Sequence, residues 1–209
     1  MDGLMINTEP IQSKAYEIIL KEYGKEPIFY KTGVVQKVGV REKDNWELIK
    51  TSHGLEEDTT VLMEKRGKVY LDVIRKNLIP QPGLINLIEM LRKHGIKMAV
   101  ASSSVLDHIE MILEGLGIRE YFEVIVSGQF VPRGKPYPDI FLEAAMKLEV
   151  NPADCVVLED AQTGVVAGKA AGSKVIAVPN QFTADQDMSK ADKILSSLED
   201  VTWGIISRM

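Results

Sequence analysis

The sequence predicts an α/β protein that has a parallel-sheet core and a small helical unit inserted near its start. Three observations lead to this prediction. Residues 10–78 carry apolar residues at helical spacing and few strand-like runs. After the Pro- and Gly-rich residues 80–83, helical stripes alternate with short β-branched runs. The 209 residues, 45% of them hydrophobic, can bury one core plus a small appended domain. Residues 1–9 and 79–209 are therefore expected to form the core, and residues 10–78 the helical unit.

The inserted unit is expected to contain three helices. Apolar residues recur at helical spacing from Ile11 to Tyr23, where Gly24 ends the pattern. Shorter amphipathic segments follow at residues 46–52 and 57–77. Two connecting strands are expected between the inserted unit and the core, at residues 5–9 and 77–83.

The core is expected to alternate helices and strands. Helical stripes lie at residues 84–91, 106–116, 139–148 and 164–171. Short apolar, β-branched runs typical of buried strands lie at residues 97–101, 123–126, 155–158 and 174–178, with one more at 192–195. In such an arrangement the strands run parallel, and ligands bind beside their carboxyl ends. The residues that follow each strand are therefore the candidates for function.

Composition excludes several classes of protein. The net charge is −5 and the sequence pI is about 5.4, and the Lys and Arg residues are scattered, so neither a nucleic-acid surface nor a membrane surface is expected. The single cysteine, Cys155, excludes an internal disulfide, fits a reducing compartment and is expected in the core. No export signal and no apolar run of the roughly 20 residues that span a bilayer is evident. A monomer in the cytoplasm is expected.

Polar side chains follow several of the predicted strands. Ser102 begins a run of three serines after one strand, and Glu159 and Asp160 follow another. Lys135 lies between Gly and Pro in a loop after a third strand, and Asp2 lies in the first turn of the chain. The serines could form an ordinary polar loop and Lys135 an ordinary turn. Two adjacent acids at the end of a buried strand, however, repel each other unless a positive charge lies nearby.

These residues resemble, in order along the chain, the four motifs of the haloacid dehalogenase (HAD) superfamily. The matching positions are Asp2-Gly3, Ser102, Lys135 in Gly-Lys-Pro-Tyr-Pro-Asp, and Glu159-Asp160 in Glu-Asp-Ala-Gln-Thr-Gly. The resemblance covers the whole chain. The chain is most similar to the subfamily of β-phosphoglucomutase and small sugar-phosphate phosphatases, which has a Rossmann-like core and a helical cap inserted after the first motif. Residues 10–78 correspond to that cap.

The resemblance implies that a phosphoryl group is transferred to an Asp carboxylate and then released. It places Mg²⁺ on the carboxylates of Glu159 and Asp160 and on the backbone carbonyl of Asp2. It assigns the contacts with the phosphoryl oxygens to the Ser102 hydroxyl and the Lys135 ammonium. Asp2 corresponds to the general acid and base of the family. Asp2, Ser102 and Lys135 are thus the expected catalytic residues.

The nucleophile of the family lies two residues before the position that Asp2 matches, at the end of a central strand. This sequence contains neither that Asp nor that strand. Without the strand, its two neighbours would carry unpaired backbone groups, each costing about 1–3 kcal/mol when buried. We therefore interpret Met1 as an internal methionine and expect the strand and the nucleophile just upstream. If Met1 were the true start, a catalytically inactive HAD-like binding protein would be expected instead.

Three residues are candidates for substrate binding: Gln12, Arg41 and Ser103. Mutases of the subfamily have His where this chain has Gln12, and Gln cannot relay a proton. Arg41 in Gly39-Val40-Arg41 resembles a cap arginine that binds a distal phosphate, although a solvated surface charge is an equal alternative. We therefore expect a Mg²⁺-dependent phosphatase of small phosphorylated metabolites such as sugar phosphates. A phosphosugar mutase resembling β-phosphoglucomutase is the alternative within the enzyme class.

Overall fold

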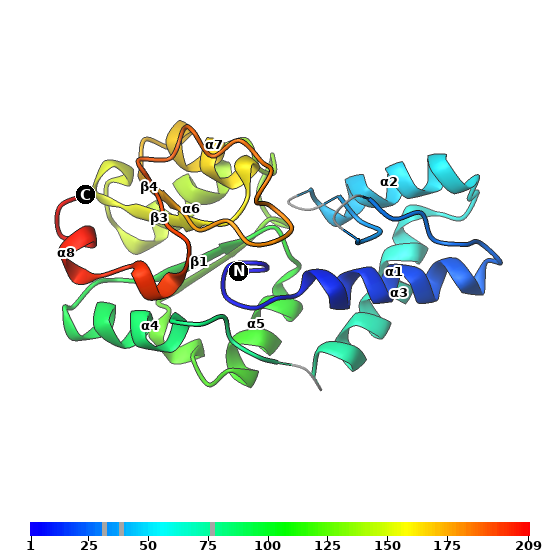
Figure 1. Cartoon of the computed structure of the whole chain (residues 1–209), viewed down its shortest axis with the longest axis horizontal. Helices are drawn as coiled ribbons and strands as arrows, with labels where there is room; N and C mark the ends of the chain where they lie inside the picture. Colours follow the sequence, from blue (N-terminus) through cyan, green and yellow to red (C-terminus); the bar gives the residue numbers. More distant parts are fainter. Residues whose placement is uncertain (31–32, 38–39, 76–77) are drawn as a thin grey trace. The chain divides into compact units, whose positions relative to one another are not determined.

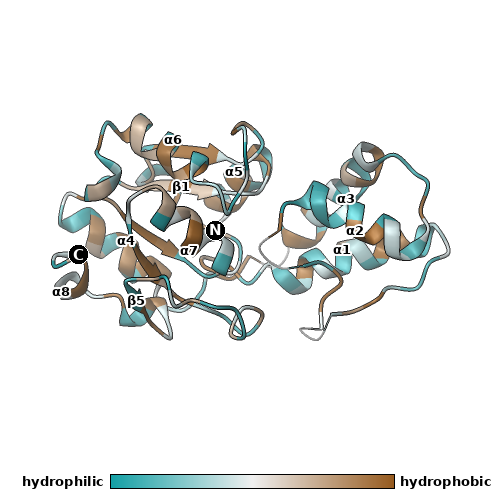
Figure 2. Ribbon diagram, turned by 90° about the horizontal axis from the view of Figure 1, so that it is seen from above, coloured by the Kyte–Doolittle hydropathy of each residue, from teal (hydrophilic) through white to brown (hydrophobic). Residues whose placement is uncertain are grey.

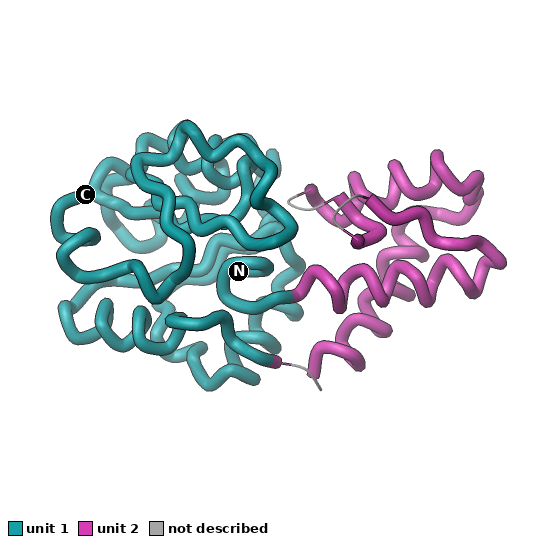
Figure 3. The backbone as a smooth tube through the Cα atoms, in the orientation of Figure 1, with its two compact units in different colours: residues 1–7, 79–209 teal, residues 8–78 magenta. Residues whose placement is uncertain are grey.

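The computed structural model describes residues 1–30, 33–37, 40–75 and 78–209, which form two compact units of an α/β protein (Figure 1, Figure 3). Unit 1 comprises Met1–Asn7 and Ile79–Met209, and unit 2 comprises Thr8–Leu78. The sequence-based division has the same order along the chain, with its first boundary after residue 9 rather than after residue 7.

Unit 2 is helical. Its helices are α1 (Glu9–Glu22), α2 (Glu42–His53) and α3 (Thr59–Ile74). Helix α3 begins at Thr59 because the Asp58 side chain caps it and accepts a 2.8 Å hydrogen bond from the Thr60 N–H. The three helices pack around buried apolar residues, among them Tyr16 and Trp46, whose rings meet edge to face with centroids 4.8 Å apart.

Unit 1 contains every helix and strand that the sequence predicts for the core, with ends that differ by no more than two residues. Its helices are α4 (Leu84–Lys93), α5 (Leu106–Gly115), α6 (Asp139–Leu148), α7 (Gln162–Ala170) and α8 (Trp203–Ile206). Its strands are β1 (Ala99–Ser102), β2 (Val124–Ser127), β3 (Val156–Glu159), β4 (Lys174–Ala177) and β5 (Lys193–Ile194). Helix α8 is the one α-helix of this unit that the sequence did not predict.

The strands are parallel, but they form two sheets. Strand β1 pairs with β2, so that Ser102 lies opposite Ser127. The second sheet has the order β3-β4-β5, and Glu159 lies opposite Ala177. Helix α6 packs against β1 and β2, while α7 packs against β3 and β4. In the described part of the chain, β1 and β3 pair on one side only, which is why the single sheet expected from the alternation is divided.

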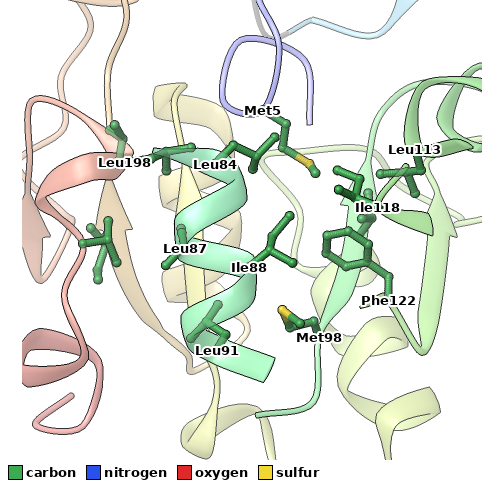
Figure 4. Packing of buried hydrophobic residues seen from close by; sticks show 14 of the residues in the cluster. Met5, Leu84, Leu87, Ile88, Leu91, Met98, Leu113, Ile118, Phe122 and Leu198 are labelled. Carbon is green, nitrogen blue, oxygen red and sulfur yellow. The ribbon is translucent and has the colours of Figure 1, made fainter. Parts of the chain in front are cut away.

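The largest apolar cluster of unit 1 is built around α4 (Figure 4). Leu87, Ile88 and Leu91 from this helix lie close to Met98 and Phe122 from the chain on either side of α5. The strands of unit 1 are largely hydrophobic, whereas its helices carry hydrophilic as well as hydrophobic residues (Figure 2). This pattern is typical of strands that are buried on both faces.

The two connecting strands expected from the sequence are reduced to a single bridge. Ile6 pairs antiparallel with Pro80, and the Gln81 N–H donates to the Met5 carbonyl at 2.7 Å. Helix α1 begins at Glu9, the last residue of the first segment, because Pro10 suits the first turn of a helix. Residue 77, the expected start of the second strand, lies outside the described residues.

Two expectations from composition have different outcomes. Cys155 is only half-buried, because it immediately precedes β3, and its thiol lies 3.5 Å from the Asn151 carbonyl, so the prediction of a core cysteine is wrong. Within the described ranges, no helix combines the length and the apolar character needed to cross a membrane.

Candidate active site

The first turn of the chain meets the end of β1. Gly3 has a φ of +75° and donates its N–H to the Ile6 carbonyl at 2.9 Å, which closes a tight turn that suits glycine. One carboxylate oxygen of Asp2 accepts hydrogen bonds from the Ser104 hydroxyl at 2.8 Å and from the Ser102 hydroxyl at 3.4 Å. Residues about a hundred positions apart along the chain therefore share one edge of the sheet.

Lys135 and Glu159 form a buried ion pair at the same edge. Their side chains are 9% and 8% exposed. Glu159 is the last residue of β3, and Lys135 comes from the loop between β2 and α6. The Lys135 ammonium also donates to the Ala101 carbonyl of β1 at 3.3 Å. Lys135 thus joins the ends of β1 and β3 and supplies the positive charge that the two adjacent acids require.

Glu159 is held as a carboxylate. Burial alone would raise its pKa, but the Lys135 ammonium and a hydrogen bond from the Ala161 N–H together hold the pKa of Glu159 below its ordinary value. The N–H groups of Asp160 and Ala161 approach one of its oxygens at 3.1 and 3.4 Å. The side chain is therefore charged at neutral pH in a site that excludes most water.

Gly164, in the first turn of α7, allows that helix to approach Glu159. A β-carbon at residue 164 would lie 2.0 Å from the carboxylate carbon of Glu159, closer than side chains can pack. The carboxylate therefore sits against the amino end of α7, where the helix dipole favours negative charge. This explains the Gly of the Glu-Asp-Ala-Gln-Thr-Gly motif.

Asp160 points to the first turn of the chain. A β-carbon at Gly3 would lie 2.0 Å from one carboxylate oxygen of Asp160, so the turn and the carboxylate are in direct contact. The same oxygen accepts a 2.9 Å hydrogen bond from the Asn180 side-chain amide. The structure thus brings Asp2, Ser102, Lys135, Glu159 and Asp160 together at the carboxyl ends of β1 and β3.

The donors at this edge fit a hard divalent cation. In the described ranges, no three His, Cys, Asp or Glu side chains lie close enough together to hold a metal ion by themselves. Two carboxylates and a backbone carbonyl are nevertheless the kind of partial oxygen shell that suits Mg²⁺, which usually keeps several waters and takes further oxygens from a substrate phosphate. Glu159, Asp160 and the Asp2 carbonyl are the groups available for this purpose.

The candidate substrate-binding residues lie in both units. Ser103 is half-buried in unit 1, where Gly128 approaches its Cα. In unit 2, Gln12 accepts a hydrogen bond from the buried Arg66 at 3.0 Å. Arg41 immediately precedes α2, has a side chain that is 43% exposed and pairs with Asp44 at 2.9 Å. Gly39 of the Arg41 motif lies outside the described residues.

Sequence reasoning gave no role to two residues of this edge. Ser104 donates the shorter of the two hydrogen bonds to Asp2. Asn180 donates to Asp160, and it follows β4 just as the predicted site residues follow other strands. The rule that points to residues after strands would have found Asn180 had it been applied to β4 as well.

The chain is similar in sequence and in fold to several known proteins. The chain is 38% identical over 217 residues to a bifunctional riboflavin kinase/FMN phosphatase of Arabidopsis thaliana, covering 98% of this chain but only 54% of that relative. It is 32% identical over 177 residues to a phosphorylated carbohydrates phosphatase of Thermotoga maritima, covering 82% and 79% of the two chains. The fold is similar to that of CbbY from Rhodobacter sphaeroides in complex with phosphate, with a TM-score of 0.85 at 24% identity over 96% of this chain and 92% of that one.

The haloacid dehalogenase-like hydrolase family matches residues 1–178, a range that includes all four motif positions gathered at the edge of β1 and β3. The chain belongs to the haloacid dehalogenase-like hydrolase family.

Proposed function

We propose that this chain is a Mg²⁺-dependent phosphatase of small phosphorylated metabolites such as sugar phosphates, working through an aspartyl-phosphate. The observation that carries the proposal is the buried pair of Lys135 and Glu159, in contact with β1 and next to Asp160 and the Asp2 turn. A structural ion pair needs neither a second buried acid beside it nor a cluster of hydroxyls. A site that binds a metal and a phosphoryl group needs both.

Each residue has a task that follows from its position. Lys135 and the Ser102 hydroxyl would donate to the phosphoryl oxygens and stabilise the charge that develops on them. Asp2, held by Ser102 and Ser104, would give a proton to the leaving oxygen and later take one from the attacking water. Mg²⁺, when bound at Glu159 and Asp160, would reduce the repulsion between these carboxylates and the phosphate.

The proposed nucleophile would lie on a strand upstream of Met1, between β1 and β3. Both strands line one cavity of about 900 Å³ in unit 1, together with apolar residues of α4 and α6. Parallel strands buried in an α/β core normally pair on both sides, unless they lie at a sheet edge that is covered or short. An apolar strand ending in Asp would pair with both edges and place its carboxylate beside Lys135 and Asp160.

The substrate class follows from the relatives and from the cap. The relatives named above act on phosphorylated carbohydrates and on FMN, and the proposal carries their common feature, a phosphate monoester on a small polyol or sugar, to this chain. Gln12, Arg41 and Ser103 are the residues proposed to bind the substrate. We further propose a monomer that acts in the cytoplasm and binds neither nucleic acid nor membranes, in line with the net charge of −5.

The test compares two proteins, the present chain and a chain lengthened by the residues encoded immediately upstream of Met1. The lengthened chain is expected to release phosphate from sugar phosphates or FMN only when Mg²⁺ is present. The present chain is expected to release almost none, because binding groups cannot replace the acceptor of the phosphoryl group. Equal Mg²⁺-dependent turnover by both proteins would refute the assigned mechanism.

Two variants of the lengthened chain test the roles of single residues in the same assay. Asp2→Asn is expected to lower kcat by about 10²–10⁴-fold, because the proton that Asp2 transfers moves only in the transition state. Arg41→Ala is expected instead to raise KM and leave kcat nearly unchanged, because substrate contacts in the cap act before and during the reaction alike. Interconversion of hexose 1- and 6-phosphates faster than phosphate release would favour the mutase.

A further inference from the structure

Asn180 joins the two parts of the site that are furthest apart in sequence. Its side-chain NH₂ donates to Asp160 at 2.9 Å and to the Gly3 carbonyl at 3.3 Å. These two acceptors come from the residue after β3 and from the first turn of the chain. One amide group therefore bridges Asp160, a predicted metal ligand, and Gly3. The residue before Gly3 is Asp2, and the Asp2 carbonyl is another predicted ligand.

The orientation of this amide is fixed from both ends. Its oxygen accepts the Phe182 N–H at 2.8 Å, so the NH₂ group must face Asp160 and Gly3. The Asn180 N–H donates to the hydroxyl of the buried Thr183 at 3.0 Å, and the Thr183 N–H donates to the Asn180 carbonyl at 3.0 Å. The turn formed by residues 180–183 after β4 thus holds the Asn180 side-chain amide in this orientation.

The packing around the bridge leaves no room for a side chain at residue 3. A β-carbon on Gly3 would lie 2.0 Å from the Asp160 carboxylate and 2.8 Å from the Asn180 nitrogen. The side-chain amide of Gln81 donates to the same Gly3 carbonyl at 3.1 Å. Asn180 couples the turn to Asp160, because its NH₂ group donates to both the Gly3 carbonyl and the Asp160 carboxylate.

We propose that Asn180 is a positioning residue for the metal site, which holds the Asp160 carboxylate and the Asp2–Gly3 turn in the arrangement that Mg²⁺ requires. One Asp160 oxygen is occupied by the amide, which directs the carboxylate and limits its rotation. Groups that orient metal ligands in this way typically contribute about 10–100-fold to metal affinity. The inference rests on the proposed function, because it takes Asp160 and the Asp2 carbonyl as ligands.

The experiment compares Asn180→Ala with the wild type and with Gln186→Ala in the present chain. Gln186 is a matched control, because it also follows β4 and its side chain accepts one backbone hydrogen bond, from the Gln162 N–H at 2.8 Å. Titration with MgCl₂ alone, followed by calorimetry, is expected to show a Kd about 10–100-fold higher for Asn180→Ala. Gln186→Ala is expected to keep the wild-type Kd.

Hydrogen exchange of the metal-free proteins provides a second measurement that does not depend on Mg²⁺. The Gly3 amide, which donates to Ile6, is expected to exchange faster in Asn180→Ala than in the wild type and in Gln186→Ala. Unchanged exchange, or faster exchange with an unchanged Kd, would overturn the role of Asn180. A wild type that takes up no Mg²⁺ would instead contradict the metal site of the proposed function, and the exchange data would still decide whether Asn180 holds the turn.

Discussion

At the scale of single residues, the site depends on a few contacts that permit no substitute. Lys135 neutralises Glu159 where water is largely excluded, and Gly164 leaves the space that the Glu159 carboxylate fills. Both residues could be read in the sequence as parts of ordinary turns or helix starts. Their roles emerge only when the groups around them are known.

Lys135→Met is expected to destabilise the protein by about 3–5 kcal/mol at pH 7, because it leaves the buried Glu159 carboxylate without its cation. In the wild type the pKa of Glu159 lies below 4.5, so its contribution to stability is present above that pH and is lost as the pH falls through the lowered pKa. In the variant, burial raises the pKa of Glu159 instead. The difference in free energy of unfolding should therefore shrink when urea denaturation is repeated near pH 4.

Lys147→Met is the control for that variant. Lys147 pairs with Glu143 at 3.2 Å on the surface of α6, and its side chain is 49% exposed. Exposed pairs contribute about 0–1 kcal/mol. A loss for Lys135→Met no larger than that of Lys147→Met would contradict the buried-pair assignment.

Gly164→Ala is expected to displace the amino end of α7, because the new β-carbon would collide with the Glu159 carboxylate. Overpacking of this kind costs about 1–3 kcal/mol, although alanine favours a helix more than glycine does. Gly204→Ala in α8 is the matched control, since its β-carbon would meet its nearest neighbour at 3.6 Å, an ordinary contact. Thermal unfolding should show a lower Tm for the first variant and an equal or higher Tm for the second.

At the scale of elements, a buried arginine of unit 2 links its three helices. Arg66 of α3 pairs with Glu42 of α2 at 3.0 Å and donates to Gln12 of α1 at 3.0 Å. Its guanidinium also lies 4.4 Å from the centre of the Tyr16 ring. Burial lowers the pKa of Arg66, but the charges of its neighbours, including Glu42, more than offset this, so it remains a cation.

Arg66→Met is expected to loosen all three helices of unit 2 and to destabilise the unit by about 3 kcal/mol or more, because Glu42 loses its partner. Arg41→Met removes the exposed pair with Asp44 and should change stability by less than about 1 kcal/mol. Trp46 lies in unit 2 and Trp203 in unit 1, so tryptophan fluorescence in a Trp203→Phe background follows unit 2 alone. Similar urea midpoints for both variants would contradict the central role of Arg66.

At the scale of the whole molecule, the division of the sheet is the feature that we expect to affect stability most. The two sheets of unit 1 line a cavity of about 900 Å³. Its apolar side chains come from β1 and β3 and from the helices around them. Burying one apolar side chain contributes about 1.5–3 kcal/mol, so a short strand placed there has a large effect on the core.

A chain lengthened upstream by about six residues, the usual length of a strand, is expected to unfold at a higher urea concentration than the present chain. The present chain is expected to bind the dye ANS more strongly, because its cavity offers apolar surface. The control is a lengthened chain in which the added residues are Gly and Ser, which cannot form that strand. An unchanged urea midpoint and unchanged ANS fluorescence in the lengthened chain would count against the proposed strand.

Much of the fold could be predicted because it is encoded locally. The spacing of Leu84, Leu87, Ile88 and Leu91 is that of one helix face, and the structure buries all four. The ends of β1 and β3 could be predicted because apolar runs stop at Ser102 and Glu159. The structure around Ile6 and Glu9 was harder to predict. A single bridge and the start of a helix compete for the same few residues there, and the local sequence favours neither.

The sequence by itself determined the α/β class, the insertion of a helical unit, and the set of residues gathered at the carboxyl ends of the strands, because periodicity and strand ends are local properties. Only the tertiary structure decided that the strands form two sheets, that Glu159 is neutralised by Lys135, and that Asn180 bridges Asp160 and Gly3. The physical reason is that pairing, burial and hydrogen bonding between distant residues depend on which groups the folded chain brings within a few ångströms, and no local pattern records that choice.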